Sequence, residues 1–236
     1  PILKLAMAFR QTGFKYFNRR LGIYLTNTLD TNVEPLGLFN LGLADSIAEE
    51  AKEAVKIKTK TPIMVVIGNP PYFGESSNKF YSGHNVYKTE PKGGNLQEKN
   101  SKWLNDDYVK FIRFAENQVD KTGEGIVAMI TAHGYIDNPT FRGMRWHLMN
   151  TFDEIYVLDL HGNSNKKERS PDGGEDKNVF NIKTGVAIIF GIKKKGDKSG
   201  QAKIHKADLY GKRPVKFEFL NTHRIDNVDW VNITPS

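Results

Sequence analysis

The alternation of short apolar runs with segments of helical periodicity constrains the fold of this chain more than any other feature. The apolar runs are PIMVVIG, GIVAMIT and EIYVLDL, at residues 62–68, 125–131 and 154–160. Between them, at 106–121 and 139–152, apolar residues recur every three or four positions, which predicts amphipathic helices. Strands that alternate with helices are typical of an α/β domain with a mostly parallel sheet.

The run at 62–68 is apolar on both faces, which predicts a central parallel strand. Two further strands are predicted at 179–192 and 202–210. A short basic turn joins them, so we expect an antiparallel hairpin at one edge of the sheet.

The flanking segments carry weaker patterns. Upstream, we predict a helix from Ile2 that Gly13 ends, a short strand at 21–27 and a helix at 45–58. The tail beyond residue 210 mixes aromatic and charged residues without a clear period, and it predicts no element.

Composition narrows the classes of function. The chain has no cysteine, which excludes disulfides, thiolate zinc sites and cysteine nucleophiles, and favours a cytoplasmic location. No apolar run reaches the ~20 residues that span a bilayer. The 34 Lys and Arg residues exceed the 27 Asp and Glu residues, and the net charge of +7 mildly favours a polyanionic partner. The chain lacks an initiating Met and opens within a predicted helix, so we expect an internal piece of a longer protein.

Asn69, Pro70, Pro71 and Tyr72 directly follow the first apolar run and have a definite chemical use. The lone pair of an exocyclic amine is delocalised into the ring of the base, so the nitrogen is a poor nucleophile. The amide oxygen of Asn69 and the carbonyl oxygen of Pro70 can accept both amine hydrogens and stabilise the charge that grows during methyl transfer. The prolines make this frame rigid, and Tyr72 offers a face on which a base can stack. We therefore predict that these four residues are catalytic.

The motif does not by itself identify the substrate. It is shared by amino-group methyltransferases that use S-adenosylmethionine, and enzymes that methylate a protein glutamine or guanine N2 in RNA resemble it at the same place. The lack of cysteine excludes methylation of cytosine C5, which requires a thiolate. The alternative without chemistry is a plain Asn-Pro turn after a strand.

Three longer segments resemble one family in order and spacing: NSKWLNDDYVKFIRFAE, GIVAMITAHGYIDNPTFRGMRWHLMNTFDEIYVLDLHGN and DKNVFNIKTGVAIIF. They are similar to the adenine-N6 DNA methyltransferase region of large single-polypeptide restriction-modification enzymes. In that family nuclease, helicase-like motor, methyltransferase and target recognition share one chain. The resemblance implies a partial Rossmann-like fold that uses S-adenosylmethionine and acts on double-stranded DNA.

The resemblance also implies how the chain is divided. Residues 1–200 would be the C-terminal part of the catalytic domain. Residues 201–236 would hold its last strand and the start of a connection to a target-recognition region.

Further site residues follow from the same resemblance. Phe180 matches an aromatic residue that packs on the flipped adenine from the side opposite Tyr72. Asn27 and Asp30 match positions near the adenine of the methyl donor, and Asn69 borders the donor as well. The alternatives are a core aromatic residue for Phe180 and turn formers for Asn27 and Asp30.

Two parts of the family's donor site have no match in this chain. They are the glycine-rich loop and the acidic residue at the end of the following strand. We therefore expect the isolated chain to bind S-adenosylmethionine weakly or not at all, and to be inactive by itself.

Four basic residues near the motif are candidates for contact with DNA: Lys79, Lys88, Arg142 and Arg145. For the two arginines, the alternative is a solvated helix face. For the two lysines, which lie in a long polar segment at 73–100, the alternative is a mobile surface loop.

The same segment places Tyr81 and Tyr87 between lysines. Aromatic residues beside a base pocket can fill the gap that a flipped nucleotide leaves in DNA. We predict no metal site: Asp172 and Glu175 are too close in sequence for a nuclease centre, and the histidines show no metal spacing.

The sequence is therefore interpreted as part of a DNA adenine-N6 methyltransferase of a restriction-modification protein. The alternatives are a protein-glutamine or RNA amino-group methyltransferase, and a non-catalytic scaffold that binds nucleic acid.

Overall fold

The computed structural model describes most of the chain in two compact units, Pro1–Thr61 and Pro62–Ser236. No helix among the described residues has both the length and the apolar character that a membrane crossing requires. The described residues are 2–14, 22–24, 26–30, 43–72, 74, 76–196, 198 and 200–234.

The first unit contains two helices, α1 (Ile2–Gln11) and α2 (Leu43–Lys60). Both were predicted, and Gly13 follows α1 with a positive φ of 85°, as expected for a residue that ends a helix. The predicted strand at 21–27 is wrong for its described residues, which are 22–24, 26 and 27 and have no strand pairing. Apolar, β-branched composition favours a strand only where a partner strand is available.

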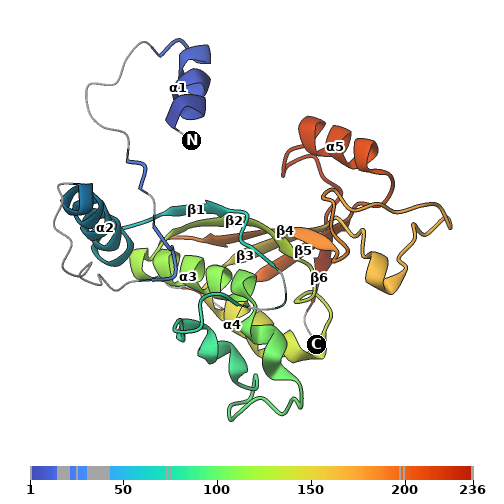
Figure 1. Cartoon of the computed structure of the whole chain (residues 1–236). Helices are drawn as coiled ribbons and strands as arrows, with labels where there is room; N and C mark the ends of the chain where they lie inside the picture. The colour runs from blue at the N-terminus through green and yellow to red at the C-terminus, as the bar shows by residue number, and fades with distance from the viewer. Residues whose placement is uncertain are drawn as a thin grey trace. The chain divides into compact units, whose positions relative to one another are not determined.

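The second unit is built on a mixed sheet whose strand order is β1-β2-β4-β3-β5-β6 (Figure 1). β1 pairs parallel with β2 and β3 parallel with β5, while β4 is antiparallel to both β2 and β3. β6 is antiparallel to β5. Four of the described strands therefore run in one direction and two in the other. The strands are β1 (Val65–Gly68), β2 (Gly125–Ala132), β3 (Glu154–Asp159), β4 (Val186–Lys193), β5 (Lys203–Asp208) and β6 (Val231–Ile233).

Helices cover both faces of this sheet (Figure 1). On one face, α3 (Asp107–Thr122) and α4 (Arg142–Thr151) share a hydrophobic core with the sheet. On the other face, α5 (Arg213–Thr222) packs over a second cluster that includes Leu158 of β3 and Ala207 of β5. Short 3-10 helices lie in the connections: η1 (Gly83–Lys88), η2 (Ser101–Asn105), η3 (Pro139–Phe141) and η4 (Ser164–Lys166).

The sequence pattern of α3 explains its position. Tyr108, Ile112, Ala115 and Val119 form a buried stripe at helical spacing, as predicted. Gly123 ends the helix at a φ of 82°, and its N–H donates to the carbonyls of the last turn.

The α/β class is confirmed, with parallel and antiparallel strand pairs in one sheet, but two predicted details are wrong. The run at 62–68 gives only a four-residue strand at an edge of the described sheet, with Val65 and Ile67 exposed. The segments at 179–192 and 202–210 do not form a hairpin, because β3 lies between β4 and β5. The division into 1–200 and 201–236 stays a prediction.

Candidate functional site: a cavity at the ends of β1 and β2

A cavity of about 1010 Å³ opens beyond the carboxyl ends of β1 and β2. This is where ligands bind in open α/β sheets. The antiparallel strand β4 begins at the same end, because Val186 pairs with Ala132. The connections that enter and leave these strands therefore meet around one space. Its walls include Asn69, Pro70, Pro71, Tyr72, Trp103, Asp106, Tyr108, His133, Asn163, Phe180 and Lys183.

The predicted motif lies in the wall of this cavity. Asn69 comes one residue after β1 and is exposed, while Pro70 is buried. Among the described residues, no group forms a hydrogen bond with the Asn69 side chain, so its amide oxygen can accept from a ligand. Tyr72 is half-buried beside the same space, and burial raises the pKa of its hydroxyl, which stays neutral at physiological pH.

Phe180 lines the same cavity although it is more than a hundred residues away in sequence from Tyr72. It lies in the connection before β4 and not within a strand, contrary to the predicted strand at 179–192. The side chain of Asn178 fixes this connection: its Oδ1 accepts from the Phe180 N–H at 2.8 Å, and its Nδ2 donates to the Thr184 carbonyl at 2.7 Å. The fold thus places the two aromatic residues around one space, and their roles with a base stay predictions.

Residues at the start of α3 complete the wall next to the motif. Asp106 is buried, and one of its carboxylate oxygens accepts from the Gly74 N–H at 2.9 Å. Its other oxygen has no partner among the described residues, and burial raises the pKa of this carboxyl. Sequence reasoning missed Asp106 and the neighbouring Trp103. An Asp before an amphipathic run indicates a helix N-terminus, but nothing in the pattern indicates a cavity.

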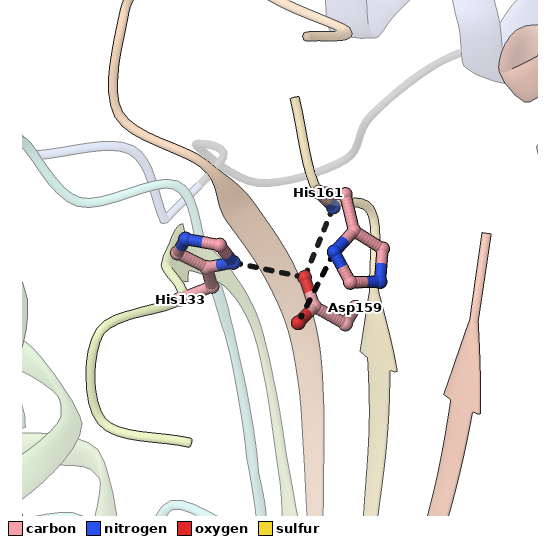
Figure 2. A group of neighbouring side chains, drawn as sticks. All are labelled: His133, Asp159 and His161. Carbon is pink, nitrogen blue, oxygen red and sulfur yellow. Dashed lines mark hydrogen bonds and ion pairs between the residues drawn. The ribbon is translucent and has the colours of Figure 1, made fainter. Parts of the chain in front are cut away.

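A cluster of histidine and carboxylate side chains lies at the ends of β2 and β3, and its member His133 also lines the cavity. Figure 2 shows the imidazoles of His133 and His161 turned toward the carboxylate of Asp159. His133 Nδ1 lies 3.0 Å from Asp159 Oδ1, and the same oxygen accepts from the His161 N–H at 3.0 Å. All three residues are buried. Burial acts to raise the pKa of Asp159, but the hydrogen bonds from His133 and from the His161 N–H outweigh it, so the pKa of this carboxyl is lowered.

His161 has carboxylates on both sides of its ring. Its Nδ1 lies 2.8 Å from Glu168 Oε1 and its Nε2 lies 2.8 Å from Asp208 Oδ1. Tyr210 stacks on the ring with the centroids 3.8 Å apart. The backbone at His161 is strained, with a φ of 52°, and surrounding contacts hold it there.

Ligand atoms of His133, Asp159 and His161 lie within 4.8 Å of one another, so this cluster could hold a cation. Hydrogen bonds nevertheless account for the same atoms. The Asn163 Oδ1 accepts from the Lys166 N–H at 3.2 Å, which turns the Asn163 Nδ2 toward His133 Nε2 at 3.0 Å. His133 Nε2 is then an acceptor and its Nδ1–H donates to Asp159. The geometry is that of a hydrogen-bonded support for the cavity wall.

The predicted DNA contacts fall into two groups. Arg142 pairs with Glu90 at 2.5 Å and with Glu98, and Arg145 donates to the carbonyls of Tyr135 and Asn138. Both guanidinium groups therefore tie segments of the protein together.

Lys79 is exposed and Lys88 is partly exposed, where burial lowers the pKa of the ammonium group. All four residues remain predicted DNA contacts.

The two tyrosines of the 73–100 segment are less available than predicted. Tyr87 has no exposed surface, and its hydroxyl donates to Glu116 at 2.7 Å. It is a core residue and does not project toward a partner. Tyr81 is partly buried and stacks with His84 at 6.2 Å between ring centroids. Phe80, in the same segment, is fully exposed.

The predicted donor residues Asn27 and Asp30 lie in the first unit. Their backbone carbonyls accept from Lys58 Nζ of α2, at 2.9 Å for Asn27. The Asn27 side chain accepts from the Leu29 N–H at 3.2 Å, which is the geometry of a turn. Contact with the donor stays a prediction for both.

Comparison with known proteins assigns the chain to a family. Residues 5–165 match the family described as Eco57I restriction-modification methylase. No curated protein is similar enough to match.

Three solved structures are similar to this chain. They are the ATP-dependent Type ISP restriction-modification enzyme LlaBIII bound to DNA (26% identity over 90% of this chain, TM-score 0.71), the DrdV–DNA complex (29% over 81%, TM-score 0.66), and a nuclease-deletion mutant of the Type ISP enzyme LlaGI with a DNA substrate mimic (25% over 80%, TM-score 0.65).

The chain spans only 15% of the LlaBIII chain and 19% of each of the other two chains. The family match, by contrast, covers more than half of this chain and includes the Asn69–Tyr72 motif. The chain therefore belongs to the Eco57I restriction-modification methylase family.

Proposed function

We propose that this chain is the target-base part of a DNA adenine-N6 methyltransferase within a restriction-modification protein. The observation that carries the proposal is the shared cavity of Asn69, Pro70, Tyr72 and Phe180 at the end of β1. Membership of a methylase family and three structural neighbours solved with DNA or a DNA mimic support it.

The acceptors at β1 would perform the chemistry on the amine. The Asn69 Oδ1 and the Pro70 carbonyl accept the two amine hydrogens, which draws the nitrogen lone pair out of conjugation and orients it for in-line attack. The same oxygens stabilise the positive charge that develops on nitrogen, and because two prolines fix them, little reorganisation is needed. The amine loses a proton after transfer.

Two aromatic rings would hold the base. An adenine inside duplex DNA is out of reach, so it must be extruded into the cavity at a cost of a few kcal/mol. Stacking on Tyr72 and on Phe180 offsets this cost, since each base–aromatic stack contributes roughly 1–3 kcal/mol.

S-adenosylmethionine would supply the electrophilic methyl group when it is bound. The volume of the cavity fits such a donor. The cavity, at about 1010 Å³, lies at the top of the ~300–1,000 Å³ range of ligand sites, which gives room for more than a base. Asn69 lies in its wall, and Asn27 and Asp30 remain the proposed contacts to the donor's adenine.

Asn69→Ala in the protein that carries this chain tests the proposal. We expect methyl transfer to fall by roughly 100-fold or more, because one of two charge-stabilising acceptors is lost. DNA binding, measured by gel shift, should survive. Transfer is measured with tritiated S-adenosylmethionine and an adenine-containing duplex.

Asn100→Ala is the matched control, because Asn100 is exposed, makes no side-chain cap and does not line the cavity. Retained transfer in Asn69→Ala would contradict the assigned role. Transfer to a protein glutamine or to RNA, with none to DNA, would support the alternative substrates. No transfer to any of them by the unmodified protein would support a scaffold.

A further inference from the structure

We propose that Arg213 of α5 is a positioning residue for the target base and that it acts through Phe180. This inference rests on the proposed function, because it assumes that a base packs on Phe180. Neither α5 nor Arg213 is indicated by the sequence pattern, and Arg213 does not line the base cavity.

The guanidinium of Arg213 holds the backbone on both sides of Phe180. Its Nε donates to the Asn178 carbonyl at 2.9 Å, and its Nη2 donates to the Phe180 carbonyl at 2.8 Å. The Phe180 N–H in turn donates to the Asn178 side chain at 2.8 Å. Both polar groups of the Phe180 backbone are therefore fixed, one by Asn178 and the other by α5.

A buried ion pair anchors α5 to the same segment. Lys216 and Asp176 have fully buried side chains, with Nζ 2.7 Å from Oδ1. Lys216 also donates to the carbonyls of Leu160 at 2.6 Å and Lys177 at 2.8 Å. Because a buried ammonium without partners is strongly unfavourable, these partners specify where α5 packs.

Asp176 extends the anchor to two loops. Its Oδ2 accepts from the Gly162 N–H at 2.6 Å and its Oδ1 from the Gly211 N–H at 2.8 Å. Gly162 itself has no room for a side chain, since a Cβ would lie 2.3 Å from Asn178 Cα. The segment from Asp176 to Phe180 is thus held between the end of β3 and the start of α5.

Packing and hydrogen bonds both bear on the position of Phe180, which packs against the second hydrophobic cluster and stays partly exposed. Phe180 lines the base cavity and also a second cavity of about 670 Å³, and the two share Ile182 and Lys183 as well. Arg213 lines only the second cavity. Because Phe180 borders both cavities, we expect the hydrogen bonds to its backbone to contribute to the position of its ring. Without the Arg213 fork, we expect the Phe180 segment to shift toward the second cavity.

The planar fork of arginine suits this role better than lysine. Nε and Nη2 present two donors in a fixed geometry, whereas an ammonium group on a flexible stem is a single point donor. A shift of about 1 Å at a positioning residue can cost about 100-fold in rate. We expect Arg213→Ala to lower kcat/KM about 10- to 100-fold and Arg213→Lys to lower it less.

The test uses the protein that carries this chain and a duplex with 2-aminopurine at the target adenine. Fluorescence of 2-aminopurine rises when it leaves the base stack and is quenched when it packs on an aromatic ring. Arg213→Ala should change the emission of the bound duplex, while DNA affinity and melting temperature stay close to those of the unmodified protein. Lys212→Ala is the control, because Lys212 is an exposed neighbour with no side-chain cap.

A double-mutant cycle separates positioning from general support. If Arg213 acts through Phe180, then Arg213→Ala should cost about 3-fold or less in kcat/KM when Phe180 is already Ala. Full additivity of the two losses would overturn the inference. So would unchanged emission and rate in Arg213→Ala. If Arg213→Ala does not fold, the same double-mutant cycle is measured with Arg213→Lys and Phe180→Ala.

The two proposals fail in different ways. An unmodified protein that neither transfers methyl groups nor changes 2-aminopurine emission would refute the proposed function. An unmodified protein that does both, and is matched by Arg213→Ala, would refute only the role of Arg213.

Discussion

Glu116 illustrates how a single buried residue joins several elements of the fold. Its side chain has no exposed surface and accepts from Tyr87, Arg113, His147 and Thr151 at 2.7–2.9 Å. These four partners come from η1, α3 and α4, so one carboxylate joins three elements on the same face of the sheet. A buried carboxylate with this many donors is stabilising only while it is ionised.

The pH dependence of unfolding tests this at the residue scale. Burial raises the pKa of Glu116, but the hydrogen bond from His147 and the charge of Arg113 outweigh it and bring the pKa from 4.5 to about 2. A depressed pKa stabilises the fold above about 4.5, and this contribution is lost as pH falls toward about 2. Glu116→Gln should lower the free energy of unfolding at neutral pH by roughly 3 kcal/mol and flatten its dependence below pH ~5.

Urea unfolding over this pH range measures the effect. Glu218→Gln, at an exposed position of α5, is the control. A Glu116→Gln profile that still falls steeply below pH ~5 would show that another carboxyl is responsible.

At the scale of elements, α4 and η1 approach each other closely at Gly143. A Cβ at this position would lie 2.2 Å from the Thr89 carbonyl oxygen and 2.4 Å from that of Tyr87. By helix propensity alone, alanine is more favourable than glycine in a helix interior by about 1 kcal/mol. Overpacking costs roughly 1–3 kcal/mol. At Gly143 the neighbouring atoms are backbone carbonyl oxygens, which cannot move aside as a flexible side chain can.

We therefore expect Gly143→Ala to destabilise the protein by roughly 1–2 kcal/mol, despite the gain in helix propensity. Thermal or urea unfolding measures this. Asn150→Ala, an exposed change on the same helix, should be close to neutral. A stabilised Gly143→Ala variant would mean that α4 and η1 can separate at little cost.

Periodicity predicted those elements whose residues face a core on one side. α3 was predicted almost to the residue because its apolar stripe repeats at helical spacing and a glycine ends it. The run that forms β1 predicts a central strand because it is apolar on both faces. Apolar composition indicates that a strand can be buried, but it does not indicate which strands lie beside it. α5 was missed because its buried face includes Lys216, whose partner Asp176 is forty residues away in sequence.

The same distinction applies to the candidate site. Asn69 to Tyr72 could be proposed as site residues because the chemistry of the motif is local, and they do line a cavity, while their role stays a prediction. Asp106 could not be predicted, because its place in the wall depends on how the start of α3 meets the end of β1. Arg142 offered no signal for its carboxylate partners, which lie about fifty residues earlier in the chain.

At the scale of the whole molecule, the chain provides more of the proposed base site than of the proposed donor site. Every residue that lines the base cavity lies between Asn69 and Thr184, within the second unit. The sequence contains no match to the family's glycine-rich donor loop. Binding of a nucleotide-like donor depends on such a loop, whose glycines let the backbone approach the ligand.

We therefore expect residues 1–236 to bind S-adenosylmethionine weakly or not at all, although Asn69 and Pro70, the proposed acceptors for the target amine, line the cavity. Isothermal titration calorimetry should give no heat beyond that of dilution at about 100 μM donor. A site with a Kd of about 1 μM would be saturated at this concentration. The protein that carries this chain is the control and should bind. Micromolar binding to residues 1–236 would overturn this expectation, and the donor site would then have to be assigned to residues of this chain.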